Sequence, residues 1–303
     1  MLPPKRPPQL TPEDISDRRG GNCLLSFGFP GSGKTTFQSF MINYLRNKGP
    51  FQFEILVPER VNGPDWEGQA IVNGWLSKWE TGRFPEPTPA QESDIREVSF
   101  KVTTTSGRKL SSEISFLEVS GELLEKVLPE PGYAPDLAQN LRAFLENPHL
   151  KFVLMLMINP DVTGNDQLFA SLMSYLDHDF PGLRDRISIG IVLTKPQACL
   201  ARLNEFSNSR QNFQRLDRDA QMAYLNRFCG QTYQIWSNWP SPRKTLLSPL
   251  YLGDIETVEG EPRLRDPDYR HIEQMFFWIV EQFTGQRPGP TWWQRLVGKM
   301  DWQ

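Results

Sequence analysis

The amino-acid sequence predicts an α/β domain of three layers, in which helices cover both faces of a mostly parallel central sheet that has one antiparallel hairpin strand. Residues 152–158 (FVLMLMI) and 187–194 (ISIGIVLT) form near-continuous apolar runs, which are typical of parallel strands covered on both faces. Helical patterns follow these runs, at 164–178 and at 197–229. Because strands and helices alternate along the chain, we expect a three-layer arrangement.

The first part of the chain shows the same alternation. Short apolar runs, helical periodicity and turn residues predict its elements. In order, they are a strand at 22–27, a helix at 34–48, a strand at 51–57, a helix at 66–80, a loop rich in Pro and Glu at 83–94, and a β-hairpin with strands at 95–104 and 112–119. The hairpin is expected to supply the antiparallel strand.

The last part of the chain predicts one further strand and one long helix. Residues 246–251 are expected to form the strand. Asp266 is expected to cap the helix with Pro267 at its first position, and Gly285 is expected to end it. Between them, apolar residues recur at the spacing of one helix face, so this helix is expected to pack on the sheet.

Composition divides the 303 residues into three segments. Residues 1–20 are rich in Pro and charged residues and have little apolar periodicity, so we expect a disordered leader. Residues 21–286 are expected to form the folded domain. Residues 287–303 form a Trp-rich tail with its apolar side chains on one helical face, and three interpretations stay open for it: packing on its own domain, docking on a partner protein, or contact with a membrane interface.

Charge and composition exclude several functional classes. A net charge of −3 and a pI of about 5.8 argue against a nucleic-acid-binding protein that depends on a basic face. No apolar run reaches the roughly 18 residues that a membrane-spanning helix needs. The 3 cysteines and 3 histidines are scattered, which disfavours a disulfide framework and a zinc site and favours a reducing, cytoplasmic location.

Residues 28–35 (GFPGSGKT) match the phosphate-binding pattern G-x-x-x-x-G-K-[ST]. The pattern lies between a predicted strand and a predicted helix, which is the context that it requires. Glycines allow successive backbone N–H groups to turn toward an anion, and the helix N-terminus adds partial positive charge. Lys34 is expected to reach the β- and γ-phosphates and Thr35 to bind Mg²⁺. The expected nucleotide-binding residues of this region are Gly28, Gly31, Ser32, Gly33, Lys34, Thr35 and Thr36.

Three further motifs make the chain similar to P-loop GTPases of the TRAFAC class, which have a Ras-like core. Residues 118–121 (EVSG) stand where that class has D-x-x-G, and residues 194–197 (TKPQ) stand where it has [NT]-K-x-D. Residues 247–249 (LSP) stand where a short S-A-x loop follows the next strand. The extra strand and helix within 51–80 resemble the bacterial double-GTPase type.

The resemblance implies a P-loop NTPase domain that binds Mg²⁺ and GTP or GDP. It assigns the guanine base to Thr194, Lys195, Gln197 and Ser248, the metal to Thr35, Thr88 and Glu118, and catalysis to Lys34, Thr88, Gly121 and Glu122. Thr88 would close over Mg²⁺ and the γ-phosphate, and the alternative for this residue is a solvated position in a Pro-rich loop. The implied activity is a guanine-nucleotide switch that signals to a protein partner.

Three positions depart from the pattern of the class. Glu118 replaces an Asp, and its extra methylene would shift the carboxylate unless the strand adjusts. Gln197 replaces the Asp that accepts two hydrogen bonds from guanine, and a neutral amide offers one acceptor. Glu122 lies where a Gln often orients water, and its charge would repel the γ-phosphate, so we expect slow hydrolysis. An ATPase or kinase, favoured by Gln197, and a scaffold that binds nucleotide without hydrolysis, favoured by Glu118 and Glu122, are the alternatives.

Overall fold

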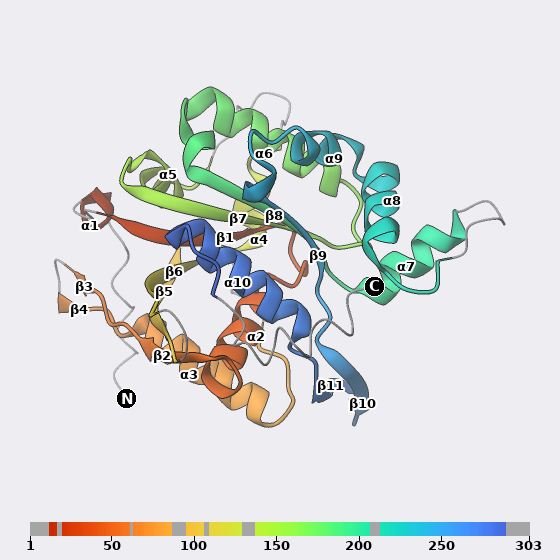
Figure 1. The fold of residues 1–303 in the computed structure, drawn as a ribbon, viewed down its shortest axis with the longest axis horizontal. Coiled ribbons are helices and arrows are strands. Elements are labelled where there is room, and N and C mark those ends of the chain that lie inside the picture. The colour runs from red at the N-terminus through yellow and green to blue at the C-terminus, as the bar shows by residue number, and fades with distance from the viewer. Residues whose placement is uncertain are drawn as a thin grey trace.

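The structure is a computed structural model, and it describes residues 12–16, 20–60, 63–86, 95–105, 109–128, 137–206 and 213–288. Its centre is a seven-stranded sheet with the order β2-β5-β6-β1-β7-β8-β9 (Figure 1). The strands are β2 (Phe51–Ile55), β5 (Arg96–Thr104), β6 (Ser111–Glu118), β1 (Gly21–Phe27), β7 (Leu150–Ile158), β8 (Ile187–Leu193) and β9 (Thr245–Pro249).

Strand directions confirm the predicted sheet. β1 runs parallel to both β6 and β7, and β8 runs parallel to β7 and β9. β5 pairs antiparallel with β6 on one side and with β2 on the other, so within this sheet β5 alone runs against its neighbours. The mostly parallel sheet with one antiparallel hairpin strand is therefore the observed arrangement.

Helices cover both faces of the sheet, which confirms the three layers. One face packs against α2 (Lys34–Asn47), α3 (Glu67–Glu80) and α10 (Arg270–Thr284). The other packs against α5 (Gln139–Glu146), α6 (Asn165–Asp179), α7 (Pro196–Glu205), α8 (Arg218–Phe228) and α9 (Gly230–Ser237). In β1, Leu24 points to the first core while Cys23 and Leu25 point to the second, because successive side chains of a strand face opposite sides.

A hairpin between the last strand of the sheet and the last helix was not predicted. β10 (Gly253–Val258) pairs antiparallel with β11 (Glu261–Pro267). Glu259 and Gly260 connect the strands with φ values of 55° and 84°, as a two-residue type I′ turn requires. The hairpin extends beyond the end of β9 (Figure 1).

The predicted beginning of the last helix is wrong, whereas its predicted end is correct. Asp266 and Pro267 belong to β11, and α10 begins at Arg270. The Asp-Pro pair imitates a capped helix start, but here its backbone is extended and pairs with β10. Gly285 ends α10 with a φ of 70°, a left-handed conformation that favours glycine.

A short helix, α1 (Pro12–Ser16), lies within the segment for which we expect disorder. Ile15 is buried against the core that contains α5, and Asn147 donates a hydrogen bond of 2.8 Å from Nδ2 to the Ile15 carbonyl. These five residues differ from the expectation because one apolar side chain finds a place in the core. The Trp-rich tail lies outside the described residues from residue 289 onward.

The remaining elements are short. They are β3 (Glu59–Arg60), β4 (Gly63–Pro64), α4 (Gly121–Glu125), and two turns of 3₁₀ helix at Leu183–Arg186 and Pro242–Lys244. The single helical region expected at 197–229 contains α7 and α8, with residues 207–212 outside the described part. In the described part of the chain, no helix combines the length and the apolar character that a membrane crossing requires.

Candidate nucleotide-binding site

The phosphate loop connects the end of β1 to the beginning of α2, as the motif requires. Gly31 and Gly33 have φ values of 70° and 85°, which non-glycine residues rarely adopt. At Gly28 a Cβ atom would lie 2.7 Å from both the Met157 carbonyl oxygen and Ser32 Oγ. The three glycines therefore allow a path that places the loop directly over the ends of β1 and β7.

Lys34 is held inside this loop. Its Nζ donates hydrogen bonds to the carbonyl oxygens of Gly28 (2.8 Å) and Phe29 (3.1 Å). Burial lowers the pKa of Lys34 to about 8, although the nearby carboxylates, of which that of Glu122 is the strongest, act in the opposite direction. The two hydrogen bonds use two of the three donors of the ammonium group, which leaves one donor for an anion.

Two of the three residues expected to bind the metal, Thr35 and Glu118, come together in the structure. Thr35, in the first turn of α2, donates a hydrogen bond of 3.1 Å from Oγ1 to Oε1 of Glu118 at the end of β6. The Glu118 residue is buried. The extra methylene of Glu118 therefore does not prevent its carboxylate from reaching Thr35.

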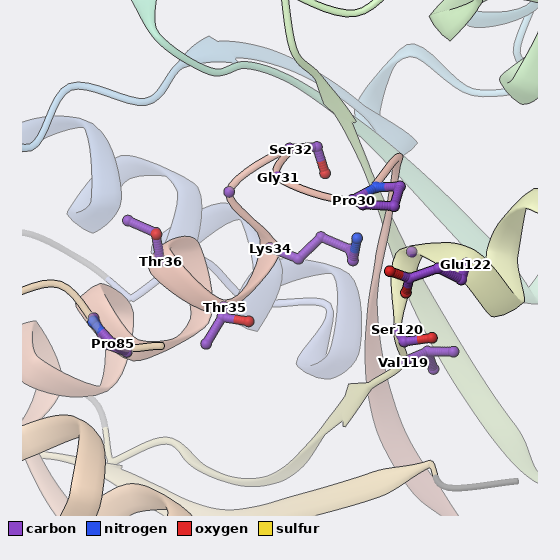
Figure 2. A pocket seen from close by; sticks show the side chains of 12 residues that line it. Pro30, Gly31, Ser32, Lys34, Thr35, Thr36, Pro85, Val119, Ser120 and Glu122 are labelled. Carbon is purple, nitrogen blue, oxygen red and sulfur yellow. The ribbon is translucent and has the colours of Figure 1, made fainter. Parts of the chain in front are cut away.

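The loop after β6 touches the phosphate loop. At Gly121 a Cβ atom would lie 2.3 Å from the Pro30 backbone nitrogen, so only glycine fits this position without a shift of the backbone. Glu122 follows at the beginning of α4, is exposed, and borders the same cavity. In Figure 2 the Lys34 side chain extends toward the side of the cavity where Glu122 lies.

These residues enclose a cavity of about 170 Å³, which we call the phosphate cavity. It is lined by Pro30, Gly31, Ser32, Gly33, Lys34, Thr35, Thr36, Pro85, Val119, Ser120, Gly121 and Glu122 (Figure 2). Ser32 Oγ is buried and has no hydrogen-bond partner in the described part of the chain. A hydroxyl in that condition is a donor that a bound anion would satisfy.

A second cavity of about 290 Å³, which we call the nucleoside cavity, adjoins the first. The two share Gly31, Ser32, Gly33 and Thr36. The nucleoside cavity is lined further by Phe84, Thr194, Lys195, Pro196, Gln197, Leu250, Tyr251, Leu252, Gly253 and Ile255. Its lining therefore combines apolar side chains with the residues of the TKPQ motif.

The TKPQ motif lies at the end of β8, as expected. Thr194 anchors it by donating a hydrogen bond of 2.8 Å from Oγ1 to the Ile158 carbonyl. Lys195 has a left-handed backbone, with a φ of 49°, and its ammonium forms an ion pair with Asp161. Gln197 is exposed at the rim of the nucleoside cavity.

Three of the predicted site residues that the structure describes line neither cavity: Gly28, Glu118 and Ser248. Ser248 is buried within β9, donates a hydrogen bond to the Pro249 carbonyl, and lines neither cavity. The residues that follow it, 250–253, form the wall instead. Gly28 lies beneath the loop rather than in the lining, and Thr88 lies outside the described residues.

Sequence reasoning missed several residues of the site. Asn159 directly follows β7 and donates a hydrogen bond of 3.2 Å from Nδ2 to the Gly31 carbonyl, which braces the phosphate loop. Asp161 pairs with Lys195 from the same connection. The available signal was their position, because ligand-binding residues of α/β sheets gather at the carboxyl ends of strands. Nothing local in the sequence indicated Phe84 or Ile255.

No protein-family model matches the chain, and no curated protein matches it. A putative nucleolar GTP-binding protein 1 from Plasmodium falciparum is similar in structure, with 12% identity, a TM-score of 0.35, and coverage of 94% of this chain and 95% of that chain. A signal recognition particle receptor SRb-GTP/SRX complex from Chaetomium thermophilum has 13% identity, a TM-score of 0.34, and coverage of 87% and 99%.

The order and direction of the strands identify the fold. The phosphate loop follows the first strand, the sheet is mostly parallel, and the antiparallel strand is the one that precedes the EVSG motif. The chain thus has the three-layer α/β fold of a P-loop domain that the sequence motifs predict.

Proposed function

We propose that this protein is a Mg²⁺-dependent guanine-nucleotide switch that hydrolyses GTP slowly and signals to a protein partner. The observation that carries the proposal is the continuity of the two cavities across Gly31, Ser32, Gly33 and Thr36. One cavity offers an ammonium group and loop N–H groups to an anion, and the other offers an apolar space with a polar rim. A nucleoside triphosphate has these two parts in the same order.

Thr35 at the start of α2 and Glu118 at the end of β6 suit a magnesium ion. Mg²⁺ prefers octahedral oxygen ligands at 2.0–2.1 Å, and adjacent ligands of such an octahedron lie about 3 Å apart. The 3.1 Å between Thr35 Oγ1 and Glu118 Oε1 agrees with that spacing. Thr35 and Glu118 would hold the ion, with Thr88 as a proposed third residue, and the bound ion would neutralise charge on the β- and γ-phosphates.

No group of three or more His, Cys, Asp or Glu side chains that could hold a metal occurs in the described part of the chain. A site of one hydroxyl and one carboxylate needs phosphate oxygens and water to complete it. We therefore expect metal and nucleotide to bind together, as is common for Mg²⁺ in phosphate-transfer sites.

Hydrolysis would depend on positioning rather than on a strong base. Lys34 would hold the β- and γ-phosphates, and the backbone at Gly121 would approach the γ-phosphate from the loop that touches Pro30. Glu122 would face the attacking water, and its negative charge would oppose the γ-phosphate. Loss of the γ-phosphate would free the loop at Gly121, and this change would be read by the partner.

Base recognition is the point at which a second function is favoured by an observation. Gln197 stands at the rim of the nucleoside cavity, where a carboxylate would select guanine. Its neutral amide offers one acceptor and one donor group, which also suits adenine. An ATP-binding protein of the same fold is therefore the second candidate.

Titration of the purified protein with fluorescent GTP, GDP, ATP and ADP, with Mg²⁺ or with a chelator, tests the proposal. We expect guanine nucleotides to bind more tightly than adenine nucleotides. Mg²⁺ is expected to raise the affinity for the triphosphates more than the affinity for the diphosphates. Equal or tighter binding of ATP would favour the second candidate, and the absence of binding by all four nucleotides would refute both.

A further inference from the structure

The β10–β11 hairpin forms part of the outer wall of the nucleoside cavity. Gly253 and Ile255 of β10 line the cavity. Ile255 is 54% exposed, so its apolar surface is available to a molecule in this cavity. Figure 1 shows this hairpin beyond the end of β9, close to the amino-terminal part of the molecule that contains α2 and α3.

The two ends of the hairpin are held closely together at its base. Gly253 has a φ of 121°, and a Cβ there would lie 1.9 Å from the Asp266 carbonyl oxygen. Asp268 donates a backbone hydrogen bond of 2.7 Å to the Leu252 carbonyl. An irregular register lies between Asp254 and Ile255, and such bulges re-aim side chains next to functional sites.

The hairpin is also joined to the segment after α3. Leu264, which pairs with Ile255 across the hairpin, is buried and donates a backbone hydrogen bond of 2.8 Å to the Gly82 carbonyl. At Gly82, φ is 68° and a Cβ would lie 2.5 Å from the Leu264 carbonyl oxygen. Arg83 and Arg263 form a backbone bridge beside this contact. We call this contact the Gly82–Leu264 joint.

The joint connects the hairpin to both cavities. Two residues after Gly82, Phe84 lines the nucleoside cavity, and the next residue, Pro85, lines the phosphate cavity. The segments near 83 and near 255, which are about 170 positions apart in the sequence, thus face one cavity. They are connected through Leu264, which pairs with Ile255 and donates a hydrogen bond to Gly82. A displacement of either segment at the joint would move the other.

We propose that the hairpin is a nucleoside clamp, with Ile255 contacting the base or ribose from outside and the Gly82–Leu264 joint positioning it. The inference rests on the proposed nucleotide binding, and it identifies the hairpin as a source of affinity for the nucleoside part. An aliphatic side chain buries apolar surface but does not read the hydrogen-bonding edge of a base. The clamp therefore strengthens the binding of guanine and adenine nucleotides equally. Discrimination between the two bases is left to the residues of the TKPQ motif.

Inorganic tripolyphosphate separates the clamp from the phosphate loop, because it has no nucleoside part. In competition against a fluorescent nucleotide, Ile255→Ala is expected to lower the affinities for GDP and for ADP by the same factor, about 3- to 10-fold. Its affinity for tripolyphosphate should equal that of the unmodified protein. Thr257→Ala, two residues along the same strand and outside the cavity lining, is the matched control and should leave all three ligands unchanged.

Gly82→Ala tests the joint without touching the cavity lining. Since a Cβ there would push against Leu264, this variant should weaken the binding of GDP and ADP by a larger factor than the binding of tripolyphosphate, because Pro85 also borders the phosphate cavity. Retained tripolyphosphate binding shows that the fold is intact. Unchanged nucleotide affinity in Ile255→Ala, in a protein that binds nucleotide, would overturn the clamp and leave the proposed function standing. Failure of the unmodified protein to bind any nucleotide would instead overturn the proposed function.

Discussion

Substitution of Lys34 by Ala separates the binding role of this residue from its structural role. In the structure its ammonium group contacts the carbonyl oxygens of Gly28 and Phe29 and borders the phosphate cavity. We expect the variant to lose most of its triphosphate affinity and to keep its fold.

The magnitude follows from the contacts of Lys34. Loss of one charge-assisted hydrogen bond to phosphate costs about 1.5–3 kcal/mol, which corresponds to about 10- to 150-fold weaker binding. Burial lowers the pKa of Lys34 from 10.5 to about 8, and this shift corresponds to a penalty of about 3 kcal/mol on the charged side chain. Relief of that penalty opposes the loss of the two hydrogen bonds, so the variant should remain folded without ligand.

Competition against fluorescent GTP measures the affinity, and thermal unfolding without ligand measures the stability. Lys48→Ala, at the other end of α2 and exposed, removes the same charge far from the cavity and should bind as the unmodified protein does. A folded Lys34→Ala protein with unchanged triphosphate affinity would refute the phosphate-loop reasoning.

Three further substitutions or treatments have expected outcomes. Gln197→Asp should raise the preference for guanine over adenine nucleotides by about 1–3 kcal/mol, and an unchanged ratio of GDP to ADP dissociation constants would show that the base is held elsewhere. Single-turnover GTP hydrolysis should be near the rate of Ras-like proteins without a partner, about 10⁻⁴ s⁻¹, and this rate should change little in Glu122→Gln. A rate near 1 s⁻¹ that falls sharply in this variant would make Glu122 a general base. Cys23, Cys199 and Cys229 are buried, and burial raises the pKa of the Cys199 and Cys229 thiols to about 12. A thiol reagent at pH 8 should therefore react with these cysteines only after denaturation. Rapid labelling of the folded protein would contradict their burial.

Local patterns were enough to predict the centre of the fold. β7 and β8 were recognisable because strands buried on both faces are almost entirely apolar. The phosphate loop was recognisable because its glycines and Lys34 meet geometric demands that few other residues satisfy. The Thr35–Glu118 contact joins residues 83 positions apart, and it was predicted only because the EVSG motif resembles that of a known class.

The outer wall of the nucleoside cavity could not be predicted in the same way. β10 and β11 are mostly exposed on both faces, so they lack the alternation that identifies a half-buried strand. Asp266 and Pro267 gave a helix-start signal that strand pairing overrides. Ser248 was chosen by its place after a strand, but β9 continues through it and the wall begins at Leu250. In each case a tertiary contact decided the outcome.

Photocrosslinking with 8-azido-GTP, followed by mass spectrometry of the labelled peptides, tests most directly the claim that the two joined cavities hold one nucleotide. The reactive group is on the base, so label should appear near Phe84, in 194–197 or in 250–255, which line the nucleoside cavity. Excess GTP and the Lys34→Ala substitution should both suppress it. Label that is confined to other parts of the surface, or that persists in excess GTP, would contradict the account.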